Sequence, residues 1–341
     1  MQARADAGLT ALKIPQTVLI APDSFKGSFS ALEVAQAVGD GLRAAGHPVE
    51  LCPVADGGEG TLDVLVGALG GELRSTTASD PLGRPIEASV GLCPLGRAVV
   101  GVVETAAASG LGLVNAGDRD PVAASTYGTG ELIMAALDAG ADEIYLGVGG
   151  SATTDGGSGA LRAIEEQGGL QRAKLTVLCD VRTPFEDAAR VFGPQKGAGP
   201  GQVRRLTARL GRLARTWRRD PRGVPLTGAA GGLSGGLWAA LGAELVPGAA
   251  FVLDRLDFDS RMRAARAVVT GEGRLDQQSL AGKALSEVAT RARQSGVPCY
   301  AIVGRRELNS FGIRILDLQS VLEAGTAREI RAAAKRLGEV V

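Results

Sequence analysis

The sequence predicts an α/β protein of two domains, and three observations support this prediction. Apolar runs at 17–21 and 49–54 are each followed by a helical pattern, which makes a β-α-β-α opening. Residues 72–104 instead hold three closely spaced strand patterns separated by turns, an antiparallel patch that indicates a second domain or an insertion. The length of 341 residues is enough for about two domains.

The first elements are predicted from local signals. Residues 17–21 form an apolar run typical of a buried parallel strand. Ser30 and Glu33 have the spacing of a capping box, which predicts a helix that ends at Gly46. A strand over 49–54 follows. Asp56 and Glu59 repeat the capping-box spacing and predict the start of a helix over 60–69.

The rest of the chain continues with the same kinds of pattern. The Pro200 helix has one apolar face and an opposite face with seven arginines between 204 and 219, which we interpret as a solvated surface. RNA binding is the less supported interpretation of those arginines, because aromatic residues are not interleaved with them. The further expected strands are 72–78, 86–92, 98–104, 143–148, 175–179, 265–269, 299–303 and 313–318, and the expected helices are 125–139, 156–167, 200–217, 228–242, 279–294 and 327–337.

Composition excludes several classes of protein. Lys plus Arg and Asp plus Glu number 37 each, so no net charge directs the chain to nucleic acid or to a membrane surface. No apolar run reaches the roughly 18 residues of a membrane span. Four cysteines lie far apart, which favours buried thiols in a reducing compartment. We therefore expect a cytoplasmic protein that binds neither nucleic acid nor membrane, with a loose extension over residues 1–15.

His47 is the only histidine, and it lies in a turn between a helix pattern and a strand pattern. A Ser-His-Asp triad, a Cys-His nucleophile and a histidine-rich metal site are therefore not expected. Acid–base chemistry must come from carboxylates or lysines.

A glycine-rich loop over 147–159 follows the apolar strand at 143–148 and precedes a predicted helix. Glycines allow backbone N–H groups to approach a ligand, and a helix N-terminus adds a partial positive charge, which suits a phosphate. The alternative is a tight turn in which Asp155 only caps the helix. The loop is neither a P-loop nor a dinucleotide fingerprint, so both interpretations stay open.

Four acidic residues follow predicted strands, at the edge where ligands bind in open α/β sheets. Lys26 and Lys283 lie near them in sequence. Carboxylates so placed repel one another unless a cation or substrate lies between them, and Mg²⁺ prefers a few carboxylates plus phosphate oxygens. A magnesium–nucleotide site explains the set better than a hydrolase does, although a cap or turn role remains an alternative for the individual residues. The four are Asp23, Asp56, Asp180 and Glu272.

Five motifs along the chain closely resemble those of the bacterial type-1 glycerate kinases. They occur in the family's order over most of the chain, and that order makes the resemblance specific. The motifs are APDSFKGS at 21–28, PVADGGEGT at 53–61, GGSATTDGG at 149–157, VFGPQKGA at 191–198 and TGEGRLD at 270–276.

The resemblance implies a fold and a reaction. It implies a flavodoxin-like parallel-sheet domain and a mixed α/β domain likened to restriction endonucleases, with the site in the cleft between them. We expect the first domain to comprise 16–70, about 120–168 and 265–341, and the second to comprise about 71–119 and 169–264. The implied reaction transfers a phosphoryl group from ATP, with Mg²⁺, to D-glycerate.

With this resemblance, each candidate residue has a hypothetical role. The Gly149–Gly157 loop would hold ATP phosphates, and Asp155 or Glu272, or both, would hold Mg²⁺. Asp56 is preferred over Asp180 as the group that orients or deprotonates the hydroxyl. The catalytic candidates are Asp56, Lys26 and Asp180. The substrate and phosphate candidates are Asp23, Ser24, Lys26, Gly149, Gly150, Ser151, Thr153, Lys196 and Lys283.

Two alternatives to glycerate phosphorylation remain. The segment 181–187 after Asp180 is shorter than the family pattern, as would suit a member that binds glycerate or nucleotide without turnover. A kinase of another small hydroxy acid is the second alternative. The sequence leaves open whether 2- or 3-phosphoglycerate is formed and whether the protein is a homo-oligomer.

Overall fold

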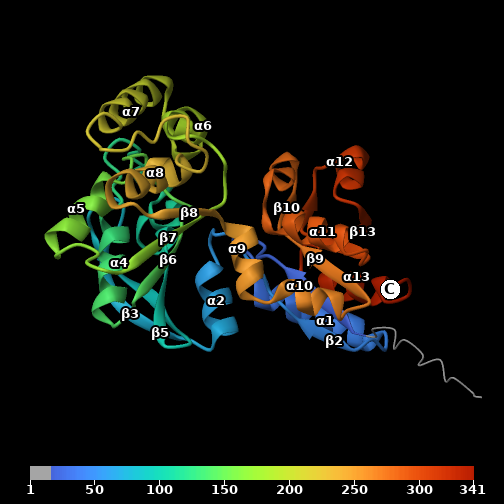
Figure 1. Cartoon of the computed structure of the whole chain (residues 1–341). Helices are drawn as coiled ribbons and strands as arrows, with labels where there is room; N and C mark the ends of the chain where they lie inside the picture. Colours follow the sequence, from blue (N-terminus) through green and yellow to red (C-terminus); the bar gives the residue numbers. More distant parts are fainter. Residues whose placement is uncertain (1–16) are drawn as a thin grey trace, which may run out of the picture.

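The structure, a computed structural model, describes residues 17–341. The extension expected over residues 1–15 lies outside the described residues. The chain forms two bodies, each built on its own sheet, and Figure 1 shows them side by side with α2 and α9 between them. No helix within residues 17–341 has the length and apolar character needed to cross a membrane.

The first body contains a five-stranded parallel sheet in the order β13-β11-β9-β1-β2. Counted along the chain, this order is 2-1-3-4-5 from the β2 edge, the flavodoxin-like arrangement, so that prediction is confirmed. Every residue of β1 and β9 is buried, as expected of central parallel strands. The strands are β1 (Val18–Pro22), β2 (Val49–Leu51), β9 (Ala267–Gly271), β11 (Cys299–Val303) and β13 (Leu318–Glu323).

Helices cover both faces of this sheet. On one face, α1 packs so closely on α13 that a Cβ at Gly41 would overlap the carbonyl oxygen of Arg331. The predicted capping box of Ser30 and Glu33 is present at the start of α1. The helices of this body are α1 (Ala31–Ala44), α10 (Phe258–Arg263), α11 (Ala284–Gln294), α12 (Ser310–Ile315) and α13 (Ala327–Leu337).

The second body contains a six-stranded mixed sheet in the order β3-β4-β5-β6-β7-β8. Its first three strands form the predicted antiparallel patch, and β5 to β8 are parallel. The strands are β3 (Glu72–Ser79), β4 (Pro85–Leu95), β5 (Ala98–Glu104), β6 (Glu143–Gly147), β7 (Lys174–Cys179) and β8 (Glu244–Pro247).

The alternation of side chains along β6 divides the core of this body. Ile144 and Leu146 pack on the side of α4 and α5, whereas Tyr145 faces the opposite side with α2. The helices of this body and its connections are α2 (Thr61–Leu69), α3 (Thr105–Ser109), α4 (Tyr127–Asp138), α5 (Ser158–Glu166), α6 (Ala188–Phe192), α7 (Pro200–Leu213), α8 (Ala229–Leu241) and α9 (Gly248–Arg255), with 3-10 turns η1 (Leu111–Leu113), η2 (Ala116–Asp118), η3 (Phe185–Asp187) and η4 (Pro194–Lys196).

The predicted domain boundaries are wrong for residues 120–168. These residues were expected in the body of the first strand, but β6 pairs with β5 and β7 in the six-stranded sheet. The boundaries are also wrong for α10, which was expected in the second domain but packs against the first sheet. The apolar pattern of β6 suits a buried parallel strand in either sheet, so the sequence identifies the strand but not its partners.

Three local predictions also need correction. The strand expected over 313–318 begins only at Leu318, as β13, because Asn309 caps the helix α12 over the preceding residues. The helix expected from 279 begins at Ala284, after the turn η5 (Gln277–Ala281). The helix over 228–242 is kinked, with left-handed φ at 230–232, and a Cβ at Gly231 would overlap the carbonyl oxygen of Thr153.

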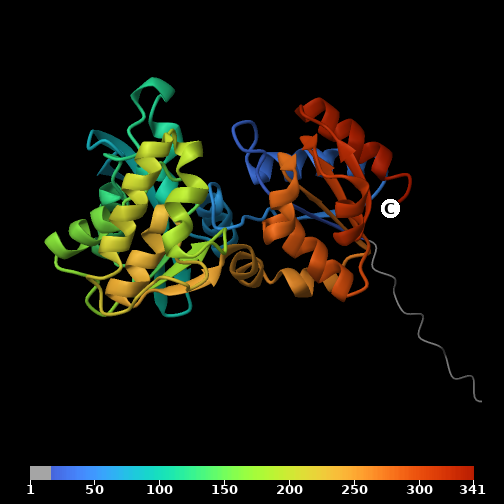
Figure 2. The ribbon, with the colours of Figure 1, turned by 90° about the horizontal axis from the view of Figure 1, so that it is seen from above.

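Two segments connect the bodies, and their helices pack in the interface. The first connection runs through α2 and the second through α9, as Figure 2 shows from above. Tyr145 of β6 contacts Phe251 of α9 edge to face, with ring centroids 4.8 Å apart. The loop between β2 and α2 contacts the ends of β6 and β7 in the other sheet.

Candidate functional site

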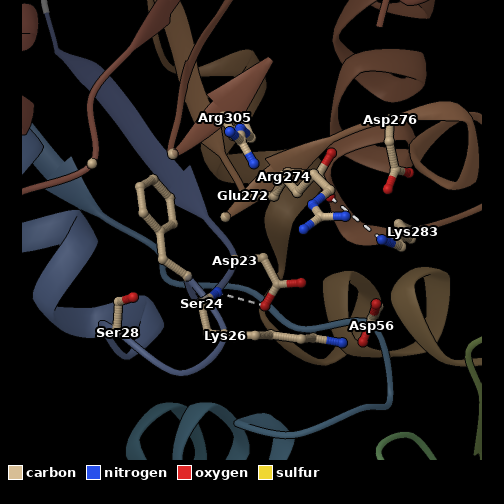
Figure 3. Close-up of a pocket in the computed structure, with 14 residues that line it drawn as sticks. Asp23, Ser24, Lys26, Ser28, Asp56, Glu272, Arg274, Asp276, Lys283 and Arg305 are labelled. Atoms are coloured by element: carbon tan, nitrogen blue, oxygen red, sulfur yellow. Dashed lines mark hydrogen bonds and ion pairs between the residues drawn. The ribbon is translucent and has the colours of Figure 1, made fainter. Parts of the chain in front are cut away.

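A cavity of about 540 Å³ lies at the carboxyl ends of the five-stranded sheet. It is placed at the topological switch point between β1 and β9, where open α/β sheets bind ligands. Figure 3 shows that charged side chains of both signs converge on it. The lining residues are Asp23, Ser24, Phe25, Lys26, Ser28, Asp56, Glu272, Gly273, Arg274, Asp276, Lys283, Gly304, Arg305 and Gly325.

The loop after β1 is fixed by a tight turn. Phe25 is buried among the residues of α1 and β9, and its N–H donates to the carbonyl of Phe29. Gly27, with φ of +78°, makes the left-handed turn that brings the chain back to α1. The adjacent Asp23 and Lys26 therefore project into the cavity from a rigid support (Figure 3).

Asp56 begins a glycine-rich loop that touches both bodies. Its Oδ1 accepts from the N–H of Gly58 at 2.9 Å. The N–H of Gly149 donates to the carbonyl of Gly57, and a Cβ at Gly57 would lie 2.6 Å from the carbonyl oxygen of Leu178. The loop thus places Asp56 in the cavity while resting on the ends of β6 and β7. The predicted capping role of Asp56 and Glu59 is wrong, because Gly60 is the N-cap residue of α2.

Lys26 lies among the acidic residues of the cavity, and its side chain points toward Asp56 (Figure 3). The carboxylates of Asp56, Asp23, Asp180 and Glu59 raise its pKa, so the ammonium is charged at neutral pH. Its positive charge offsets the negative charge of carboxylates from the ends of β1 and β7 and from the loop after β2.

Three carboxyls of the cluster hold their protons unusually tightly. Burial and the neighbouring Asp56 raise the pKa of Asp23 well above its usual range and that of Asp180 to about 6. Burial also raises the pKa of Glu272 to about 7. Near neutral pH the site therefore contains carboxyls that a cation would help to ionise.

These shifts predict that the ligand-free protein loses stability as the pH rises. A carboxyl whose folded-state pKa exceeds its ordinary value contributes stability that is present below that value and is lost as pH rises through the folded pKa. For Glu272 the window runs from 4.5 to about 7. E272Q should therefore stabilise the ligand-free protein at about pH 8, by up to roughly 3 kcal/mol, and flatten the dependence of Tm on pH.

Thermal melts between about pH 5 and pH 8 would check this prediction. Glu244 is exposed, so E244Q is the matched control and should leave the pH dependence unchanged. If Tm changed with pH to the same extent in E272Q and in the unsubstituted protein, the loss of stability could not be assigned to Glu272.

Glu272 has the features of a ligand for a cation that would also bind phosphate oxygens. It is 5% exposed, its Oε1 has no hydrogen-bond partner among residues 17–341, and its Oε2 lies 3.9 Å from the Nζ of Lys283. In the same part of the chain, no group of three or more His, Cys, Asp or Glu could hold a metal by itself. The donor set suits Mg²⁺ that also binds water and phosphate oxygens.

Asp155 does not join this cluster, so of the two expected Mg²⁺ ligands only Glu272 lies in the cavity. Its Oδ2 accepts from the N–H and Oγ1 of Thr126 and the N–H of Gly159, and its Oδ1 accepts from the N–H of Gly157. Both oxygens are occupied in stabilising the N-termini of α4 and α5. The structure thus supports the capping alternative, and we withdraw Asp155 as a metal ligand.

The glycine-rich loop is also a poorer phosphate site than its composition indicates. The Asp155 carboxylate already accepts hydrogen bonds from N–H groups at the N-terminus of α5 that were expected to hold phosphate. Other N–H groups of the loop donate to backbone carbonyls, as Gly149 does to Gly57 and Ala152 does to Ser109. Neither Gly149 nor Gly150 lines the cavity at the switch point.

Three predicted phosphate-binding residues form a separate cluster. The Nζ of Lys196 donates to the Oγ of Ser151 at 2.9 Å and to the carbonyl of Thr153. Burial lowers the pKa of Lys196 to about 8, although Asp155 and Asp180 oppose that shift. The positive charges of Lys26 and Lys196 both lower the pKa of Asp180, which therefore lies near both cations, at the boundary of the two bodies.

Sequence reasoning missed the arginines of the cavity. The strands β10 (Arg274–Leu275) and β12 (Arg305–Arg306) pair as a short parallel ribbon, which brings Arg274 and Arg305 to the same edge. Arg274 lies within the fifth motif, and Arg305 lies just after the strand β11, so the strand-end rule could have selected both. Phe25, Ser28, Asp276 and three glycines were missed as well.

The comparisons agree with this fold and site. The model of the glycerate kinase family matches residues 18–167 and 165–334. The glycerate kinase of Halalkalibacterium halodurans is 42% identical over 325 residues, covering 84% of this chain and 85% of the relative. The glycerate 2-kinase of Escherichia coli is 39% identical over 324 residues, covering 84% of each.

A solved structure is similar over almost its whole length. The crystal structure of a protein from Salmonella typhimurium LT2, provisionally named glycerate kinase 2, has a TM-score of 0.80 and 35% sequence identity, covering 95% of this chain and 97% of that one. The matches span both sheets. The chain therefore belongs to the glycerate kinase family, and it is a phosphotransferase whose acceptor is an alcohol group.

Proposed function

We propose that this protein phosphorylates D-glycerate with ATP. The observation that carries the proposal is the cavity at the switch point, where carboxylates and cations converge at the strand ends of a chain from the glycerate kinase family. Phosphoryl transfer depends mainly on positioning and on charge neutralisation, which such a charged site can supply.

The cations on the ribbon side of the cavity would bind the nucleotide phosphates. Arg274, Arg305 and Lys283 line this side and offer donors to phosphate oxygens (Figure 3). Glu272, with its unpartnered Oε1, and the neighbouring Asp23 would hold Mg²⁺ together with those oxygens. When bound, the ion would neutralise charge on the phosphates.

The acceptor hydroxyl would lie near Asp56 and Lys26. Asp56 takes the hydroxyl proton while the hydroxyl oxygen bonds to the γ-phosphorus, and the bond from that phosphorus to the bridging oxygen breaks to release ADP. Lys26 balances negative charge at this point. Lys196 and Asp180, at the boundary of the bodies, stay candidates for contacts with the carboxylate and hydroxyls of the acceptor.

We expect R305A to raise KM for ATP about tenfold, because it removes charge-assisted hydrogen bonds to phosphate. Arg306 follows it in β12 and does not line the cavity. R306A removes the same charge outside the cavity and is therefore the matched control. Steady-state kinetics with varied ATP would compare the two variants. An equal KM in both would place the nucleotide elsewhere.

A coupled assay of ADP release tests the function. ADP release with D-glycerate, and much less with L-glycerate or glycolate, is expected. Faster release with another hydroxy acid would assign that acceptor instead. If no hydroxy acid supports ADP release while D-glycerate or ATP raises Tm, the protein is a binding protein without turnover.

We propose 2-phosphoglycerate as the product, on the support of the name of the Escherichia coli relative. ³¹P NMR of the reaction mixture would distinguish it from 3-phosphoglycerate. Detection of the 3-phosphate would overturn this part of the proposal and leave the kinase activity standing.

A further inference from the structure

We propose that Glu104 is a positioning residue that holds the loop carrying Asp56 in its working place. It is the last residue of β5, in the six-stranded sheet, and does not line the cavity. Its effect on turnover rests on the proposed function, whereas its effect on the loop does not.

Glu104 joins the end of β5 to the start of α2 through hydrogen bonds. Its Oε1 accepts from the N–H of Gly60 at 2.9 Å and from that of Leu62 at 2.7 Å. Gly60 is the N-cap of α2 and has no side chain to satisfy these donors. Glu104, 8% exposed, thus supplies the cap from a sequence distance of 44 residues.

The start of the loop is held differently from its end. A Cβ at Gly248 would overlap the carbonyl oxygen of Asp56, and one at Gly147 would lie 2.8 Å from that of Gly57. Close backbone packing thus confines this part. At the α2 end, Glu104 is the one side chain from outside the loop with hydrogen bonds to residues 56–62, among those found in residues 17–341.

A carboxylate here has a cost that argues against an incidental role. Burial raises the pKa of Glu104 to about 7, with hydrogen bonds from Leu62 and Gly60 opposing the shift. The nearby Asp63 and Glu59 also disfavour its negative charge. The helix N-terminus is favourable for an anion, so the contact with α2 is what stabilises the buried group.

Loss of Glu104 would leave two N–H groups without their acceptor at the end of a loop whose other end is fixed. The loop would gain freedom between Gly58 and Leu62. The backbone of Asp56 would stay confined, but its carboxylate would lose the fixed N–H of Gly58 that sets its orientation toward Lys26. Small displacements of reacting groups cost catalysis more than binding. We therefore expect kcat to change more than KM.

The test compares E104A and E104Q with a matched control. In E104A, kcat should fall about 10–100-fold while KM for ATP stays within about twofold. E104Q keeps an acceptor oxygen and should recover most of the activity. Asp80 is a buried carboxylate in the β3–β4 turn that accepts from the N–H groups of Leu82 and Arg84, so D80A should lower Tm without lowering kcat.

A double-mutant cycle separates positioning from general damage. If Glu104 acts through Asp56, E104A should lower kcat by less than about twofold in the D56N background. Equal losses of kcat in both backgrounds, or an unchanged kcat in E104A, would overturn the positioning role.

Hydrogen exchange tests the inference without reference to turnover. Amides over 56–65 should exchange faster in E104A than in E104Q, D80A or the unsubstituted protein. Unchanged exchange there would overturn the inference even for an active kinase. If the unsubstituted protein releases no ADP but E104A loosens this segment, the proposed function fails and the structural link stands.

Discussion

Replacing Asp56 with asparagine is expected to lower kcat about 10²–10⁴-fold, the usual contribution of a general base. The side-chain amide of D56N would keep an oxygen that can accept from the N–H of Gly58, so the loop can retain its conformation. What is lost is the negative charge that takes the hydroxyl proton and that raises the pKa of Lys26. Steady-state kinetics with D-glycerate and ATP would measure the effect.

The control for this prediction is another acidic residue of the same segment. Asp63 lies on the exposed side of α2 and does not line the cavity, so D63N should leave kcat unchanged. The D56N protein should melt near the temperature of the unsubstituted protein. Near-normal turnover of a folded D56N would transfer the role to Asp180, whose pKa of about 6 suits a base at neutral pH.

Replacing Lys26 with methionine is expected to lower kcat about 10²–10³-fold, comparable to the loss of one preorganised donor to the transition state. The methionine has a similar length but cannot balance the carboxylates of Asp56, Asp23 and Asp180. Because Lys26 lowers the pKa of Asp180, the pKa of that carboxyl should rise in K26M. Asp180 is a candidate for contacts with the acceptor, so an acidic limb of the pH–kcat profile that reports its ionisation should move to higher pH.

The exposed Lys174 at the start of β7 is the matched control, and K174M should have an unchanged profile. The shift of the acidic limb distinguishes a charge effect from damage to the fold, which would lower kcat equally at every pH. A K26M protein with normal kcat would place the essential cation elsewhere, with Lys196 as the next candidate.

Much of the cavity could be predicted because its residues follow a local rule. Asp23 and Glu272 come directly after apolar runs, and the carboxyl ends of parallel strands share one edge of a sheet. The structure brings both into the cavity with Asp56, Lys26 and Lys283, as the strand-end argument expects. Ser24 lies there too, whereas Asp180 reaches the cluster from the other sheet.

Asp155 shows why the same reasoning failed for the glycine-rich loop. Sequence composition indicates free N–H groups and a carboxylate near a ligand. The carboxylate instead binds Thr126, 29 residues away, and closes the helix N-terminus that a phosphate would need. Whether a polar group is free depends on its partners in space, which local spacing does not reveal.

The sequence by itself determined the α/β class, most strand positions and the residues that follow the strands, because side-chain periodicity and turn residues act over short distances. Only the tertiary structure decided that β6 belongs to the six-stranded sheet, that Arg305 joins Arg274, and that Glu104 caps α2. The physical reason is that strand pairing and buried hydrogen bonds depend on residues far apart in the chain. Those distant contacts select which of the polar groups remain available for chemistry.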